Sequence, residues 1–208
     1  MQHLIYAGRP AAEQREAFLR IIGNDPVVSR VLEAVAGLDL PDWWLVSGAL
    51  YNTVWNALTG RPPGYGIRDA DLFYFDDTDL SYAAENRVIA AATPFTRHLP
   101  VPVEIRNQAR VHLWFEDKFG VPYPPLRSGC EGIARFTSRA HAVGVRLQKD
   151  GSLRLHAPFG LEDIFAFRVT PNTVLDNRRT HMAKAERAKS CWPELEIVPW
   201  PESQVMDG

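Results

Sequence analysis

The sequence contains little cysteine. Its two cysteines, Cys130 and Cys191, lie far apart and form no Cys-x-x-Cys pattern. Structural zinc sites and disulfide frameworks need several suitably spaced ligands or paired cysteines, so the sequence predicts neither. Scarce and widely separated cysteines are typical of a reducing compartment, and we expect a cytoplasmic protein.

Long apolar runs are also missing. No stretch reaches the roughly 20 apolar residues that a membrane-spanning helix needs. The N-terminus has no apolar segment followed by a small-residue cleavage site. We therefore expect no membrane partner.

Neither sign of charge is in large excess. The chain has 23 lysines and arginines against 25 aspartates and glutamates, a net charge of -2. Without a global positive field, tight nonspecific binding to nucleic acid is not favoured, so DNA is not an expected partner and long RNA is disfavoured. A local basic face stays compatible with this balance. The sequence also lacks the His-Glu-x-x-His and Gly-x-Ser-x-Gly motifs of zinc peptidases and α/β-hydrolases.

The chain does have the material for a folded core. Hydrophobic residues make up 46% of its 208 residues, which excludes a disordered chain. No repeat or linker composition interrupts it. We predict one domain, residues 1–208, with a core of about 25–120 and a C-terminal extension of about 121–208. The proline-rich loop 121–127 is the nearest candidate for a boundary between them.

The apolar pattern predicts an α/β (α+β) fold with a small mixed sheet, followed by a hairpin and further helices. Strands are expected at 43–46, 70–75 and 101–106, and a hairpin at 142–147 and 152–156. Helices are expected at 10–23, 26–36, 49–58, 81–92, 108–119, 128–136, 161–167 and 173–190, with an irregular tail after residue 193.

Two aspartates stand at the start of an expected strand. Asp69 and Asp71 are separated by one residue, and alternate side chains of a strand point to the same face. An apolar run, 72–75, follows directly, so two acids there cost desolvation energy unless a cation or hydrogen-bond donors neutralise them. An Asp-x-Asp pair also occurs as a purely structural feature, and this alternative stays open.

A third acid, Glu104, interrupts the apolar strand expected at 101–106. An acid in such a strand is most often on a solvated face. Alternatively, it joins Asp69 and Asp71 across the sheet and completes a site for two divalent metal ions. In that position it could also take the proton from an attacking hydroxyl.

A small-residue turn, Ser47-Gly48, joins the expected strand 43–46 to the expected helix 49–58. Backbone N–H groups at a helix N-terminus bind phosphate, and small residues let a phosphate approach the backbone. The pair can equally be a tight turn without a ligand. Its position upstream of the two aspartates favours contact with a triphosphate.

These motifs resemble a known superfamily. The segment 45–52, Leu-Val-Ser-Gly-Ala-Leu-Tyr-Asn, resembles the strand–Gly-Gly–helix opening of DNA polymerase β-like nucleotidyltransferases, closest to that of tRNA CCA-adding enzymes and poly(A) polymerases. Asp69 and Asp71 resemble its Asp-x-Asp motif, and Glu104 its third carboxylate. From about 42 to 200 the chain also resembles a bacterial family of small nucleotidyltransferase-like proteins, through segments at 55–60, 107–114, 157–161, 171–172 and 192–193.

The resemblance implies a polymerase β-like core that transfers a nucleoside monophosphate from an NTP to an acceptor and releases pyrophosphate. The cofactor it implies is Mg²⁺ or Mn²⁺. It implies catalytic and metal-binding roles for Asp69, Asp71 and Glu104, and nucleotide-binding roles for Ser47, Gly48 and Asn52. The acceptor (small molecule, protein or RNA), the NTP, the oligomeric state and the role of the motif at 107–114 stay open.

Three departures from the superfamily pattern leave a second function open. Ser47 stands where glycine is usual, Tyr51-Asn52 stands where Arg-Asp is frequent, and the loop 61–67 lengthens the spacing to the acids. A catalytically silent nucleotide-binding or interaction module with the same fold is therefore the alternative. A sugar-nucleotide glycosyltransferase also uses Asp-x-Asp, but there an apolar strand precedes the acids, whereas a loop precedes them here.

Other polar groups have structural explanations beside functional ones. The run 76–79 lacks the EF-hand pattern and predicts a turn and a helix cap. Arg110 and His112, which lie near the third strand, are either packed residues or site residues. The basic helix at 173–190 is either a solvated face or a contact for the triphosphate or an acceptor phosphate.

Overall fold

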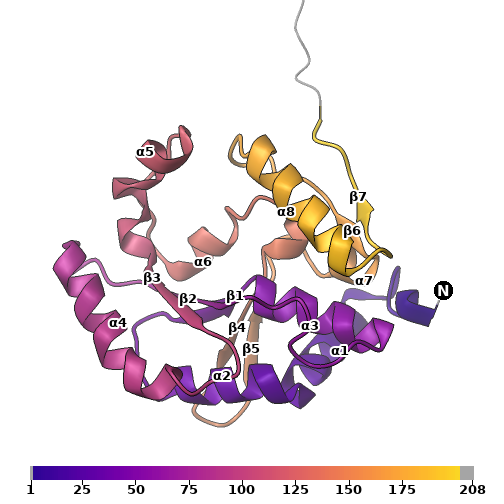
Figure 1. Ribbon diagram of the computed structural model, residues 1–208, viewed down its shortest axis with the longest axis horizontal. Helices are drawn as coiled ribbons and strands as arrows, with labels where there is room; N and C mark the ends of the chain where they lie inside the picture. The colour runs from indigo at the N-terminus through magenta and orange to yellow at the C-terminus, as the bar shows by residue number, and fades with distance from the viewer. Residues whose placement is uncertain (1, 202–208) are drawn as a thin grey trace, which may run out of the picture.

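A computed structural model describes residues 2–201, which build a five-stranded mixed sheet (Figure 1). In spatial order the strands are β3 (Val103–Asn107), β2 (Ala70–Tyr74), β1 (Trp44–Val46), β4 (Gly144–Leu147) and β5 (Leu153–His156). β2 and β3 are parallel, and the other neighbours are antiparallel. The predicted α/β fold with a small mixed sheet is confirmed.

One face of the sheet carries the main core. The helices α1 (Ala11–Asn24), α2 (Pro26–Ala36), α3 (Gly48–Thr59) and α4 (Tyr82–Thr96) share this core with Leu45, Leu72, Ile105 and Val145 of four strands. Figure 1 shows α2 and α4 lying along this side of the sheet. Because successive strand residues alternate between faces, Trp44 and Val46 point the other way and pack against α6 (Gly129–Ile133).

Local sequence signals fix the ends of these helices. The carboxylate of Asp25 accepts the N–H groups of Val27 and Val28, and Pro26 occupies the first position of α2. The hydroxyl of Ser81 accepts the N–H of Ala84 and starts α4. Gly60 ends α3 with a φ of 70°, in the left-handed conformation that glycine adopts readily.

The second half of the chain completes the sheet and adds a layer above it. β4 pairs with β1, so residues beyond 121 contribute to the same sheet as the first half. The added elements are η2 (Gln108–Leu113), α5 (Phe115–Phe119), η3 (Arg139–His141), α7 (Glu162–Phe165), β6 (Arg168–Val169), α8 (Arg178–Cys191) and β7 (Glu196–Ile197), and η1 (Gln2–Leu4) lies near the N-terminus. The division into a core of about 25–120 and an extension of about 121–208 stays a prediction.

Three sequence predictions differ from the structure. The helix expected at 108–119 is divided at Trp114, whose φ of −137° ends η2 before α5 begins. The helix expected from 173 begins at Arg178, because the Asn172 side chain accepts the Val174 N–H and donates to the carbonyls of Ala134 and Phe136. The tail is not wholly irregular, since β7 pairs with β6, a contact distant in sequence.

Across residues 2–201, the structure has no helix with the length and apolar character needed to cross a bilayer.

Candidate active site

The turn between β1 and α3 holds a serine in a glycine-like conformation. Ser47 has a φ of 57° and a ψ of −118°. Residues with a Cβ rarely occupy this region, at a cost of about 1–3 kcal/mol. Its N–H donates to the Val143 carbonyl over 2.9 Å, and its carbonyl accepts the N–H groups of Leu50 and Tyr51. Hydrogen bonds on both sides therefore hold a strained turn at the N-terminus of α3.

Replacing Ser47 by glycine is expected to raise stability by about 1 kcal/mol, because strain relief exceeds the added entropy of the unfolded chain. For a chain of this size, that corresponds to a rise in melting temperature of about 2–4 °C. Ser47→Ala is the matched control, since it removes the hydroxyl but keeps the Cβ. A glycine variant no more stable than the alanine variant in thermal unfolding would contradict the strain assigned to this turn.

The two aspartates lie beside this turn. Val46, the last residue of β1, pairs with Asp71 of β2, and Asp69 precedes the same strand by one residue. Burial, together with the neighbouring carboxylates of Asp69 and Glu104, raises the pKa of Asp71 to about 6, against the lowering effects of Lys184 and Arg106. Two partly buried acids are thus crowded at the start of a strand, as expected of a cation site.

Glu104 is in register with these acids but does not join them. It pairs with Asp71 across the parallel strands β2 and β3, so both side chains leave the same face of the sheet. However, the Glu104 side chain is 49% exposed, and its carboxylate lies 3.3 Å from the Arg106 guanidinium. In the described part of the chain, no three His, Cys, Asp or Glu side chains are grouped as metal ligands. The donor set thus fits a divalent ion through Asp69 and Asp71, while Glu104 is held aside by Arg106.

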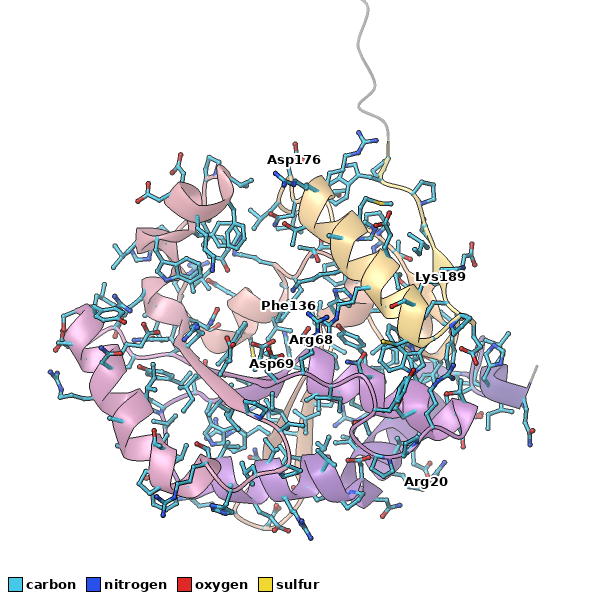
Figure 2. All side chains as sticks on the ribbon, viewed as in Figure 1. Arg20, Arg68, Asp69, Phe136, Asp176 and Lys189 are labelled. Carbon is cyan, nitrogen blue, oxygen red and sulfur yellow. The ribbon has the colours of Figure 1, made fainter. Side chains whose placement is uncertain are left out.

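One pocket unites the turn with the two aspartates. It has a volume of about 70 Å³ and is lined on the sheet side by Ser47, Gly48, Asn52, Asp69 and Asp71. Figure 2 shows Asp69 and its neighbour Arg68 between α3 and α8. Five of the six site residues expected from the sequence therefore share one small space, and Glu104 does not line it.

Helix α8 supplies the opposite side of this pocket. Lys184 and Arg187, three residues apart and hence on one face of the helix, line it together with Trp192. The sequence predicted α8 either as a solvated face or as a phosphate contact, without choosing these two residues. Their spacing is the signal that could have identified them. Acids on one side and cations on the other suit a ligand that combines a metal ion with phosphate groups.

Asn52 and Tyr51 extend the site into the first turns of α3. Asn52 is only 7% exposed, and its side-chain Oδ1 has no hydrogen-bond partner among the described residues. An unsatisfied buried acceptor costs about 1–3 kcal/mol, so a donor from a ligand would be favourable there. The Tyr51 ring stacks on the buried His141 ring, with centroids 4.6 Å apart. Burial, followed by the charge of Asp71, raises the pKa of Tyr51 and keeps its phenol protonated.

The loop 61–67 closes one end of the pocket. Gly66 has a φ of 71°, and a Cβ at this position would lie 2.4 Å from the Trp192 ring. Trp192 in turn donates its indole N–H to the Asn56 side chain over 3.0 Å. The longer spacing between turn and acids thus accommodates a loop that packs on the C-terminal end of α8.

The first residues of the motif at 107–114 hold the fold together through hydrogen bonds and an ion pair. The Asn107 side chain accepts the N–H of Ala109 at the start of η2 and donates to the Asp76 carbonyl over 2.7 Å. The buried Arg110 forms an ion pair with Glu85 of α4, so it is not a partner for Asp71. In the run 76–79, Asp79 accepts the Ser81 N–H in a local turn, as predicted, but the residue that caps α4 is Ser81 and lies outside this run.

Comparison with known proteins agrees with this geometry. A solved structure described as "The NMR structure of the protein reveals a CCA-adding enzyme head domain" matches with a TM-score of 0.71. The two chains are 23% identical, and the match covers 89% of this chain and 96% of the other. At this identity the likeness shows the fold alone. No curated protein matches the chain.

A protein-family profile described as "Nucleotidyltransferase" matches residues 33–197, which is most of the chain. The matched region runs from α2 to β7 and includes the strained turn, both pocket aspartates and the two cations of α8. The resemblance inferred from the sequence motifs is thereby confirmed, and the protein belongs to this family of nucleotidyltransferases.

Proposed function

We propose that this protein transfers a nucleoside monophosphate from an NTP to an acceptor hydroxyl or another nucleophile and releases pyrophosphate. The observation that carries the proposal is the single pocket in which the Ser47-Gly48 turn, Asp69 and Asp71 face Lys184 and Arg187. A helix N-terminus and two cations can bind the phosphates, while two acids bind a cation. Family membership supports transfer from an NTP.

The chemistry requires one bond to form and one to break. The acceptor oxygen attacks the α-phosphorus, the bond from that phosphorus to the bridging oxygen breaks, and pyrophosphate leaves with the electron pair. The acceptor proton passes to Glu104, the carboxylate next to Asp71 in register. The turn and the α8 cations hold the β- and γ-phosphates in line for this displacement, and Asn52 accepts a hydrogen bond from the nucleotide. Most of the protein's contribution is then positioning.

Asp69 and Asp71 would hold the divalent ion, Mg²⁺ or Mn²⁺. When bound, such an ion neutralises charge on the attacking and leaving oxygens. Glu104 reaches the site only if its pair with Arg106 opens. An exposed pair of this kind contributes only about 0–1 kcal/mol, so its opening adds little to the barrier.

Two observations support the alternative of a nucleotide-binding module without catalysis. Ser47 occupies a conformation suited to glycine, and Arg106 holds Glu104 away from the two aspartates. This alternative keeps NTP binding but predicts no turnover. The cytoplasmic location and the lack of a DNA partner also stay proposals, based on cysteine content and charge.

Mg²⁺ or Mn²⁺ is expected to raise the melting temperature, and NTP with metal is expected to raise it further, because ligands of the folded state stabilise it. At a ligand concentration of about 100 times the dissociation constant, the gain is about 2.7 kcal/mol. Incubation with each α-labelled NTP, followed by mass detection of labelled products, separates turnover from binding alone. If calorimetry detects no binding of a divalent ion, either with or without NTP, the metal site is refuted.

A further inference from the structure

A second, larger cavity continues from the pocket of the aspartates. It has a volume of about 540 Å³ and lies between α5, through Lys118 and Phe119, and α8 with the two residues before it, through positions 176–187. Arg68, Lys184 and Arg187 line both spaces, so the two are contiguous. In Figure 2, Asp176 lies at the outer end of α8, and Arg68 lies beside Asp69, between this helix and the sheet. A ligand in this cavity therefore lies next to the proposed reaction centre.

The cavity is strongly basic. Its lining contains one acid, Asp176, and five cations: Arg68, Lys118, Arg179, Lys184 and Arg187. Within residues 2–201, none of the five has a carboxylate within 4.0 Å. The first turn of α8 also contains two arginines and no acid, although the helix dipole favours negative charge there. A bound anion would offset both the mutual repulsion of the cations and this unfavourable charge.

An aromatic surface accompanies the cations. The Lys118 ammonium lies 5.5 Å from the Trp114 ring centroid and 5.3 Å from that of Phe119. Phe119 lines the cavity and is 41% exposed, so part of its ring is open to a ligand. Cations beside an accessible aromatic ring are the combination that binds a nucleotide, with phosphate on the cations and the base stacked on the ring. The volume of the cavity is suitable for a ligand of that size.

The positions of Lys118 and Arg179 separate this cavity from the triphosphate site. Both line the large cavity and not the pocket of the aspartates. The triphosphate already has the Ser47-Gly48 turn and the inner cations, which are Arg68, Lys184 and Arg187. The outer cations, Lys118 and Arg179, are therefore available to a second phosphate.

We propose that this cavity binds the acceptor through a phosphate group, an inference that rests on the proposed nucleotidyl transfer. The acceptor is then a nucleotide, either free or at the end of a single strand, with its hydroxyl directed along Arg68 towards Asp69 and Asp71. With a net charge of -2 the protein has no global positive field, so such binding depends on a local group of cations like this one.

Binding to the full chain without metal tests the proposal independently of turnover. The probes are a short fluorescein-labelled oligoribonucleotide, followed by anisotropy, and AMP, followed by calorimetry. The variant Lys118→Gln/Arg179→Gln removes the two outer cations, and Arg15→Gln/Arg30→Gln removes the same charge from exposed positions on α1 and α2. We expect the first variant to weaken binding of the oligonucleotide by about tenfold or more. We also expect the slope of log K against log salt concentration to become less steep by about 1 to 1.5. The control variant should bind like wild type.

Each outcome decides the proposal. Binding of AMP that depends on Lys118 and Arg179, without binding of the oligonucleotide, supports a free nucleotide as acceptor, and the converse supports a strand end. The proposal is overturned if wild type binds neither probe, or if both double variants weaken binding equally. It is also overturned if the outer variant weakens NTP binding as much as acceptor binding. Absence of NTP turnover with intact oligonucleotide binding would instead count against the proposed function alone.

Discussion

Replacing Asp71 by asparagine is expected to lower nucleotidyl transfer by about a hundredfold or more while leaving the metal-free protein at least as stable as wild type. Asparagine keeps the size of the side chain but cannot supply the negative charge that a divalent cation needs. The burial of Asp71 beside Asp69 raises its pKa to about 6, which means that its charge is unfavourable in the metal-free fold. Removal of that charge should therefore stabilise the protein when no cation is bound.

The measurement pairs melting temperature without metal with NTP turnover. Asp77→Asn is the matched control, because Asp77 is an exposed carboxylate in the loop after β2. It should change neither quantity appreciably. If Asp71→Asn lowers metal-free stability and turnover persists in the folded fraction, Asp71 is a structural acid, and the binding-module alternative gains support. Glu104→Gln should lower turnover without a large effect on stability, since its side chain is half exposed.

Replacing Arg110 by methionine should have the opposite profile, a large loss of stability with little effect on the chemistry of the folded molecule. Arg110 and Glu85 form a buried ion pair, and Arg110 also donates to the Leu80 carbonyl over 2.7 Å. Removing one partner leaves an uncompensated buried charge, which costs about 3–5 kcal/mol. For a chain of this size, the melting temperature should fall by roughly 10 °C.

A second substitution shows whether the buried charge is the cause. In Glu85→Gln/Arg110→Met the charge is gone, while the glutamine oxygen can still accept the Asn107 N–H that Glu85 binds over 2.8 Å. This variant should recover about half or more of the lost stability. The contrary result would be an Arg110→Met variant that keeps its melting temperature but loses turnover at a temperature where it is folded. That result would show a catalytic role for the motif at 107–114.

Together the two experiments separate two kinds of acid in one fold. Asp71 is partly buried near Lys184 and Arg106, yet neither cation forms an ion pair with it in the described chain, and its charge remains unfavourable. Glu85 is buried beside the Arg110 cation and also accepts the backbone N–H of Asn107. A partly buried acid without a paired cation is a candidate ligand for a bound cation. An acid whose charge is paired and hydrogen-bonded within the fold instead stabilises the structure.

The sequence by itself determined the features that depend on neighbouring residues. Asp25-Pro26, Ser81 and Gly60 fix helix ends through local sequence, since capping depends on groups within a few residues. The period of two in a strand placed Asp69 and Asp71 on one face, and the Ser47-Gly48 turn followed from a strand that runs into a helix. The superfamily resemblance rested on these same short segments.

Only the tertiary structure decided where distant residues meet. The pairing of β2 with β3 placed Glu104 beside Asp71, but Arg106, two residues further on the same face, then formed an ion pair with it. Lys184 and Arg187 reached the pocket because Trp192, the loop at Gly66 and α3 fix the path of α8 over the sheet. Such contacts depend on packing between different segments, which for α8 and the turn are more than a hundred residues apart, and periodicity and capping within one segment do not encode them.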